Sequence, residues 1–392
     1  MKKSKQSKTL LGIFIIFVIV FLNALGPFFQ LQQIATMGLL PILAGIAFLY
    51  DGKSIHTKNK EFIIFLMILL LSFTTIYYFK GFDEFTTTLS SLFGAVVAAY
   101  IAIGLTKKVD FSLFFHIGYI FSILTLFIIM IINGNISANF ASAIDFRDRF
   151  MLNANAYSYF CIFANFSLFY LYLKFKNKLL FISTLILPLL FLVIAFTTQS
   201  RAGLLLITTI NICFWLFINK PINPSKFRKI TRKFVIILAL IILGFQFLKI
   251  YQGSRIQNRV TQTANKKDSR EILIEEGIEV FIQNPILGVG LGQFPFYSKY
   301  RLFTHNSYTE ILAEQGVIGG ILLFTFYLIP TFKSIKNYRS DKNNPLYKFY
   351  LLFFITFLIY NNFYVFYKFP FSMMYFFLII SLQKNDTITK LN

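Results

Sequence analysis

The sequence has little charge for its length and few of the residues that bind metals or form disulfides. Charged residues make up 14% of the 392 residues, and there are two cysteines and three histidines. Cys161 and Cys213 both fall inside apolar runs, where buried free thiols are the expected state. No His, Cys, Asp or Glu spacing fits a metal site, and no nucleophile elbow or P-loop is present. We therefore expect neither a metal nor a cofactor.

Apolar residues occupy most of the chain instead. They make up 56% of it and include 52 phenylalanines. Repeated apolar stretches of about 20 residues are typical of transmembrane helices. The sequence therefore predicts an all-α polytopic integral membrane protein, a single membrane domain over residues 1–392 with about 12 transmembrane helices. The expected spans are residues 10–29, 31–49, 62–79, 85–105, 111–132, 153–173, 179–198, 202–219, 234–250, 306–330, 349–367 and 369–382.

The placement of the basic residues predicts the orientation. The formal net charge is +22, and 25 Lys and Arg lie in the N-terminus and alternate connections, against five in the short connections of the other side. By the positive-inside rule the first set is cytoplasmic, which places both termini in the cytoplasm. The basic balance is thus a topology signal, and no nucleic-acid partner is expected. No small-residue cleavage site follows the run from Leu10, so the first helix is expected to be retained.

One outer connection, residues 251–305, is far longer than the others, and loops longer than about 12–15 residues are usually functional or disordered. Asp268-Ser269 predicts the start of a helix that runs to about Asn284, before Pro285. Its expected apolar side consists of Ile272, Leu273, Ile278, Phe281 and Ile282. The glycines at 288, 290 and 292 permit close backbone approach, but no predicted strand precedes them, so a dinucleotide site is not supported.

A histidine follows this loop at the start of the next apolar run. Ser307 and Glu310 have the spacing of a capping box, which marks a helix start. His305 would stand just before the first turn, where the helix dipole disfavours imidazolium and leaves the ring able to accept a proton. The alternative is that His305 is only a polar residue at a membrane boundary.

Two outer arginines complete a candidate site. Arg201 lies between two spans, where a charge is costly unless it meets water, a partner or an anion. Arg270 opens the loop helix, where a cation opposes the dipole. Arginine grips phosphate oxygens with a planar fork, so with His305 they suggest a site that holds a phosphate or pyrophosphate while a hydroxyl is activated. The alternatives are an Arg201 that extends to lipid headgroups and an Arg270 that is a solvated surface charge.

An ordered set of motifs resembles a known family. It comprises Ser200-Arg201-Ala-Gly203, Arg270, Asn284-Pro285-Ile-Leu-Gly288-Val-Gly290, and His305-Asn306-Ser307-Tyr308 followed by Glu314-Gln-Gly316. In this order they resemble the O-antigen ligase and polymerase superfamily of bacterial envelope proteins. The resemblance covers residues 190–330 by motif and the whole chain by topology. Asn153-Ala-Asn155 departs from it, since many relatives have a proline between the asparagines.

The resemblance implies a metal-independent, inverting glycosyltransferase with a GT-C-like helical fold in the bacterial cytoplasmic (inner) membrane. It would move a glycan from undecaprenyl diphosphate to an acceptor hydroxyl on the outer, periplasmic side. Arg201 and Arg270 match the diphosphate-binding arginines, and His305 matches the residue proposed to activate the acceptor. The candidate supporting residues are Asn306, Glu314, Arg255 and Arg147. The expected partners are the lipid-linked donor, a glycan or lipid-linked acceptor, the bilayer, a flippase and a chain-length regulator.

Three readings of the function remain open. A polymerase and a ligase share these motifs, and we favour the polymerase because nothing in the chain points to a lipid A core acceptor. A flippase for the same lipid-linked oligosaccharide would also have about 12 spans, but it should place polar or broken helices near the membrane midplane. The polar residues here gather in one outer loop, which favours chemistry at the surface. A scaffolding membrane protein is the third reading.

Overall fold

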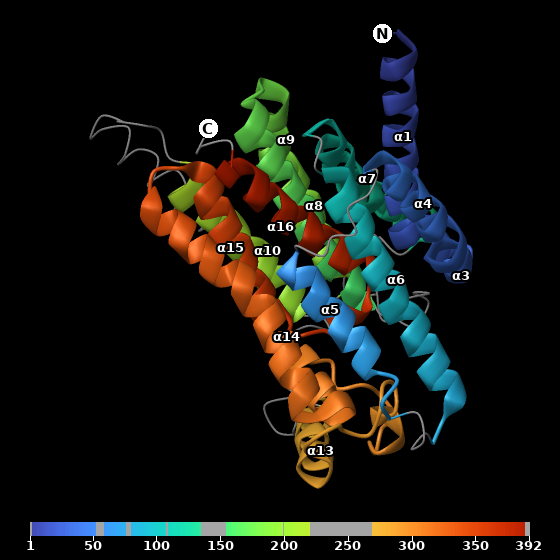
Figure 1. The fold of residues 1–392 in the computed structure, drawn as a ribbon. Coiled ribbons are helices and arrows are strands. Elements are labelled where there is room, and N and C mark those ends of the chain that lie inside the picture. The colour runs from blue at the N-terminus through green and yellow to red at the C-terminus, as the bar shows by residue number, and fades with distance from the viewer. Residues whose placement is uncertain are drawn as a thin grey trace. The chain divides into compact units, whose positions relative to one another are not determined.

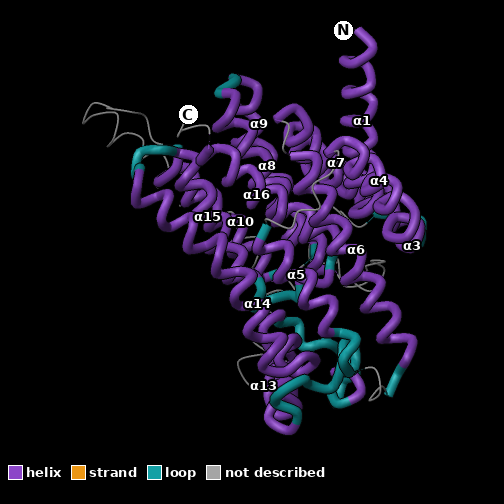
Figure 2. Tube along the Cα trace, viewed as in Figure 1, coloured by secondary structure: helices purple, strands orange, loops and turns teal. Residues whose placement is uncertain are grey.

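The computed structural model describes residues 2–51, 59–75, 80–106, 109–134, 154–198, 200–219 and 269–388. Every regular element within these ranges is helical (Figures 1 and 2). The chain divides into two compact units, Met1–Leu126 with Asp268–Asn392, and Phe127–Lys267. The first unit contains the loop helix and His305, and the second contains Arg201.

Eight helices in the described ranges are long and apolar enough to cross a membrane. They are Ser7–Phe28, Gln32–Leu49, Phe82–Thr106, Phe111–Ile132, Asn155–Phe175, Lys178–Thr197, Arg201–Ile218 and Ser307–Ser340. This confirms the polytopic helical class. The number of 12 crossings stays a prediction, because the expected span 234–250 lies outside the described residues. Two other expected spans form shorter helices than a crossing needs, α5 (Lys60–Leu71) and α15 (Pro345–Tyr360).

The first unit begins with two helical arms that reverse direction at Gln30. The arms are α1 (Lys2–Val20) with α2 (Gly26–Phe28), and α3 (Gln32–Ile34) with α4 (Leu40–Asp51), each continuous with a short π-helical turn. Gln30 has a φ of +60°, and the N–H of Leu31 donates to the carbonyl of Gly26 at 2.7 Å. This is the place where the sequence separates the first two spans. The unit continues through α5, α6 (Phe82–Thr106) and α7 (Val109–Ile132).

The last helix, α16 (Pro370–Ile388), is at the centre of the first unit and packs along α6. Every residue from 371 to 383 is buried. Phe376 contacts Phe357 of α15 at 4.7 Å between ring centroids, and Phe326 of α14 at 5.1 Å. A helix that is apolar on all sides is expected in such a core position. The expected span 369–382 therefore corresponds to a longer helix that is enclosed over residues 371–383.

Short polar residues begin several of these helices. The side chain of Asn344 accepts the N–H of Leu346 at 2.9 Å, and Pro345 occupies the first helical position of α15. Asn59 accepts the N–H of Phe62 in the same way at the start of α5. Such caps satisfy N–H groups that have no partner inside the helix.

The second unit is described over α8 (Ala154–Phe175), α9 (Lys178–Thr197) and α10 (Arg201–Cys213). The rings of Phe169 and Phe214 stack at 3.7 Å, which packs α8 against the C-terminal end of α10. At the other end of α10, a Cβ on Gly203 would lie 2.5 Å from Ser158 Oγ, so only glycine permits this approach of α10 to α8.

Helix α14 (Ser307–Ser340) contains a break at Gly316, where φ is +63° and ψ is −160°. It also continues ten residues beyond the predicted end at residue 330, because its polar C-terminal turns stay helical after the apolar run ends. Helix α13 (Ser269–Gln283) and the loop after it lie beside the N-terminal part of α14 (Figure 1). Figure 2 shows loop segments gathered around this end of α14.

We expect the substitution Gly316→Ala to destabilise the first unit strongly. A Cβ at this position would lie 2.2 Å from the carbonyl oxygen of Ile286, and the positive φ adds strain, so a loss of about 3 kcal/mol or more is expected. Thermal unfolding in detergent, followed by circular dichroism, measures it. Gly45→Ala is the matched control, because a Cβ there meets nothing within 4 Å. Equal melting temperatures for the two variants would contradict this account.

Candidate functional site

His305 immediately precedes α14, as the sequence predicts. Asn306 is the N-cap residue, and its side-chain oxygen accepts the N–H groups of Tyr308 at 2.9 Å and Thr309 at 3.2 Å. The predicted capping box of Ser307 and Glu310 is wrong, because Ser307 is already the first helical residue. The helix therefore starts close to the expected position, and its cap is Asn306, one residue before the predicted cap, Ser307.

The backbone at His305 is in the left-handed region, with a φ of +57°. This conformation costs a non-glycine residue about 1–2 kcal/mol and persists only where its surroundings fix it. The side chain is half-buried, and its ring lies 4.3 Å from the ring of Phe303. His305 is thus presented in a defined and strained local geometry.

Glu310 fixes the residue before the histidine. Its Oε2 accepts the backbone N–H of Thr304 at 2.8 Å and lies 2.9 Å from Thr304 Oγ1. Thr304 Oγ1 also accepts the N–H of Asn306 at 3.1 Å. Both chain neighbours of His305 are therefore held by buried hydrogen bonds.

A lysine joins Glu310 to a second carboxylate. Lys368 Nζ lies 3.0 Å from Glu310 Oε1 and 2.6 Å from Glu314 Oε2, and all three side chains are buried. Burial alone would lower the pKa of the Lys368 ammonium, but the charges of Glu310 and Glu314 outweigh it and raise that pKa. Removing one partner of a buried ion pair typically costs about 3–5 kcal/mol, because an unpaired charge is left behind. The three residues form an ionic cluster that the local structure depends on.

The glycine-rich segment packs directly on the broken part of α14. The N–H groups of Val289 and Gly290 donate to the carbonyls of Ala313 and Glu314 at 3.0 and 2.8 Å, and the N–H of Gly292 donates to Glu314 Oε1 at 2.9 Å. A Cβ on Gly288 would lie 2.4 Å from the backbone of Glu314. These glycines therefore permit contact between two backbones within the protein.

The loop helix α13 matches its predicted extent, and only part of its predicted apolar side packs against the protein. Leu273 and Val280 are buried, whereas Ile278 and Ile282 are 45% and 68% exposed. A Cβ on Gly277 would lie 2.6 Å from Thr309 and 3.1 Å from Thr304. The buried side thus runs through Leu273, Gly277 and Val280, and it faces the segment that carries the histidine.

Arg270 lies on this same side of α13. Its spacing of three and seven residues from Leu273 and Gly277 places all three on one helix face. Arg270 is half-buried and about 10 Å along the helix axis from Gly277, at 1.5 Å per residue. Helix periodicity thus assigns Arg270 to the face of α13 whose Gly277 packs on the His305 segment, and both residues belong to one compact unit.

Arg201 belongs to the second unit, where it is the first residue of α10 and is exposed. Ser200 caps the helix by accepting the N–H of Gly203 at 3.2 Å. The motif therefore has a clear local basis, with a cap, an exposed guanidinium and a glycine packed on α8. Arg147 and Arg255 lie outside the described residues, as do positions 251–268 of the predicted outer loop.

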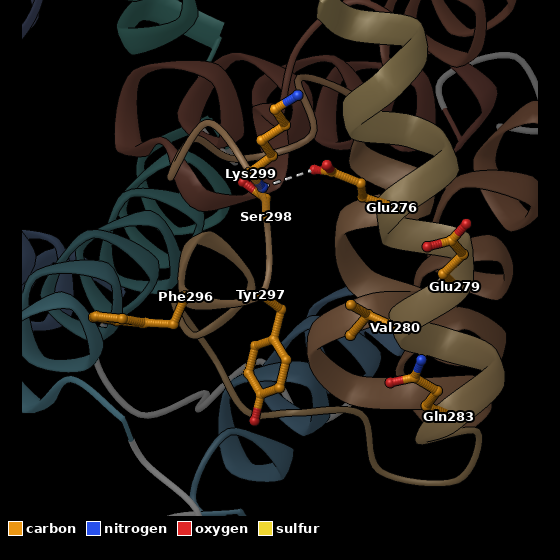
Figure 3. Close-up of a pocket in the computed structure, with 8 residues that line it drawn as sticks. All are labelled: Glu276, Glu279, Val280, Gln283, Phe296, Tyr297, Ser298 and Lys299. Carbon is orange, nitrogen blue, oxygen red and sulfur yellow. Dashed lines mark hydrogen bonds between the residues drawn. The ribbon is translucent and has the colours of Figure 1, made fainter.

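An open cavity of about 410 Å³ lies between α13 and residues 296–299. Glu279 and Gln283 line one side and Tyr297 the other, and the N–H of Lys299 donates to Glu276 at 3.2 Å across it (Figure 3). Lys80 Nζ lies 3.6 Å from the centre of the Tyr297 ring. Carboxylate, amide and aromatic groups therefore surround a space that is open to a polar ligand.

Sequence reasoning missed Lys368, Glu310 and Thr304 as parts of the site. Glu310 and Glu314 are one helical turn apart in an apolar helix, and this spacing of two acids was the available signal. Among the described residues there is no group of three or more His, Cys, Asp or Glu that could hold a metal ion.

The fold and the site define a class of protein: a multi-spanning helical membrane protein with a histidine and buried carboxylates at one end of a long apolar helix. Residues 185–324 match the family model described as O-antigen ligase. This match supports the resemblance to the O-antigen ligase and polymerase superfamily over that part of the chain. The match supports a membrane enzyme that handles glycans and gives no support to the flippase reading. A comparison with curated proteins found no match.

Proposed function

We propose that the protein transfers a glycan from undecaprenyl diphosphate to an acceptor hydroxyl at the outer face of the bacterial cytoplasmic membrane. The observation that carries this proposal is the fixed geometry of His305 at the head of α14, on the segment against which the Arg270 face of α13 packs. The family match over residues 185–324 includes Arg201, Arg270 and His305. The donor follows from the family resemblance and the phosphate-binding chemistry of arginine.

In this mechanism His305 accepts the proton of the acceptor hydroxyl as its oxygen attacks the anomeric carbon. The bond from that carbon to the diphosphate oxygen breaks, its electron pair leaves with undecaprenyl diphosphate, and the anomeric configuration inverts. Arg270 and Arg201 stabilise the charge that grows on the diphosphate. A positioned base contributes about 10²–10⁴-fold to the rate, and each electrostatic donor about 10²–10³-fold.

The cavity beside α13 suits the sugar portion of a substrate. Glu279 and Gln283 offer hydrogen-bonding groups for hydroxyls, and the Tyr297 ring offers a face for stacking. We place part of the glycan there, with both termini of the chain in the cytoplasm and this surface outside, as the charge distribution favours.

The test is turnover of a lipid-diphosphate-linked glycan by the purified protein in liposomes, together with mass analysis of surface glycan in a deletion strain. We expect release of undecaprenyl diphosphate and, for the polymerase that we favour, single repeat units in the deletion strain. Full-length chains left on the lipid carrier would indicate a ligase instead. Donor that moves between leaflets without any new glycosidic bond would contradict the enzyme and support a flippase.

A further inference from the structure

The ionic cluster of Lys368, Glu310 and Glu314 is connected to His305 through a short series of contacts. Glu310 uses its two oxygens for different partners: Oε1 lies 3.0 Å from Lys368 Nζ, and Oε2 accepts the backbone N–H of Thr304 at 2.8 Å. Thr304 is bonded covalently to His305. A change in the cluster therefore reaches the histidine through one carboxylate and one peptide unit.

Lys368 is itself held in place by separate parts of the first unit. Its backbone carbonyl accepts the hydroxyl of Ser91 in α6 at 2.6 Å. Its second acidic partner, Glu314, accepts the N–H of Gly292 from the glycine-rich segment at 2.9 Å. The ammonium is thus a fixed point at which α6, α14 and that segment meet.

The strained backbone of His305 requires such fixed surroundings. A left-handed residue that is not glycine reverts to an ordinary conformation unless its neighbours are held. Here Thr304 is held by Glu310, and Thr304 Oγ1 in turn accepts the N–H of Asn306. Within the described part of the chain, the Glu310 carboxylate is the hydrogen-bond acceptor that anchors the N–H of Thr304.

We propose that Lys368 and Glu310 are positioning residues that hold His305 in its left-handed conformation. The effect on catalysis rests on the proposed function, whereas the effect on the histidine's local geometry does not.

Glu310→Gln tests this proposal with a minimal change of shape. The glutamine amide has one acceptor oxygen and one NH₂ group. If the oxygen faces Lys368, the NH₂ group faces the N–H of Thr304. If the oxygen faces Thr304, the NH₂ group faces the Lys368 ammonium. One of the two contacts is therefore lost in either orientation. Glu61→Gln is the matched control, because Glu61 is also a buried carboxylate paired with a lysine, Lys384, at 2.8 Å.

The direct measurement is the side-chain NMR signal of His305 in protein with ¹³C-labelled histidine. The chain has only three histidines, so the signal is assigned by its loss in His305→Asn. We expect the signal to shift in Glu310→Gln and to stay unchanged in Glu61→Gln. Thr304→Val should shift the His305 signal less than Glu310→Gln does, because the backbone N–H at position 304 keeps its acceptor. If Glu310→Gln does not fold, Thr304→Val is the variant that tests the proposal.

The kinetic measurement follows the same variants. A base that is displaced by about 1 Å loses roughly 10²-fold in kcat, so Glu310→Gln should lower kcat by that amount with little change in the KM for the donor. An unchanged His305 signal in Glu310→Gln and Thr304→Val, with kcat equal to that of Glu61→Gln, would overturn the proposal. If the His305 signal shifts in Glu310→Gln but His305→Asn keeps full activity, the positioning role is supported and the proposed function is refuted.

Discussion

The substitution His305→Asn should lower the rate of glycan transfer by about 10²–10⁴-fold, which is the usual contribution of a positioned general base. Asparagine tolerates the left-handed backbone better than other non-glycine residues, so the φ of +57° can persist in the variant. It retains a polar side chain but cannot take up the proton. The expected loss of transfer rate therefore measures the contribution of His305 as a base, because the backbone at the start of α14 is preserved in the variant.

The measurement is single-turnover transfer from a lipid-diphosphate donor by protein in liposomes. Single-turnover conditions separate the transfer step from product release. His116→Phe serves as the control, since His116 is fully buried in α7 and its ring meets Tyr375 edge-on at 6.0 Å, a contact that phenylalanine can keep. Wild-type rates in His305→Asn would remove His305 from the mechanism and favour the reading of a polar residue at a membrane boundary.

The local features of the site could be predicted from the sequence because they depend on residues that are close along the chain. The start of α13 at Ser269 and the break after it follow from short-range signals, and so does a helix that begins directly after His305. The cap was placed on Ser307 although Asn306 provides it. Asparagine and serine both favour the cap position, so tertiary contacts decide which of the two adjacent residues caps the helix. Here the Ser307 hydroxyl donates to Asn361, the C-cap residue of α15, at 2.6 Å, which leaves Asn306 as the cap.

The ionic cluster could not be predicted because its members meet only in the tertiary fold. Lys368 is 58 residues from Glu310 and 54 from Glu314. Charge counting places it only among the five basic residues of the short outer connections. Its burial at 7% exposure follows from the position of its turn between α15 and the enclosed helix α16.

The face of α13 that packs on the protein could not be predicted from the sequence, for a reason specific to membrane proteins. In a surface helix of a soluble protein the apolar side is the buried side, so hydrophobic periodicity predicts which side is buried. Here apolar residues occur on both sides, and the buried stripe passes through Gly277, which has no side chain to signal it. Ile278 and Ile282 satisfied the pattern but are exposed. Hydrophobic periodicity therefore identified the helix without identifying its contact face.

Arg270→Ala should reduce transfer by about 10²–10³-fold, the usual loss when one electrostatic donor to a developing charge is removed. Its planar guanidinium can bind two phosphate oxygens at once, whereas lysine offers a point charge. Arg270→Lys should therefore recover only part of the rate. The folded state should tolerate both changes, because a cation in the first turn of α13 opposes the helix dipole.

Arg339→Ala provides the matched control for this prediction. Arg339 is an exposed arginine in the last turn of α14, more than 30 residues from His305 along the chain, and its removal should leave transfer unchanged. The rates are compared at saturating and limiting donor, because a residue that stabilises the leaving group lowers kcat as well as kcat/KM. If Arg270→Ala behaves like Arg339→Ala, Arg270 does not bind the diphosphate, and another arginine, such as Arg201, must hold it. If only Arg270→Ala loses activity and Arg270→Lys recovers part of it, the guanidinium fork on the face of α13 is what binds the phosphate.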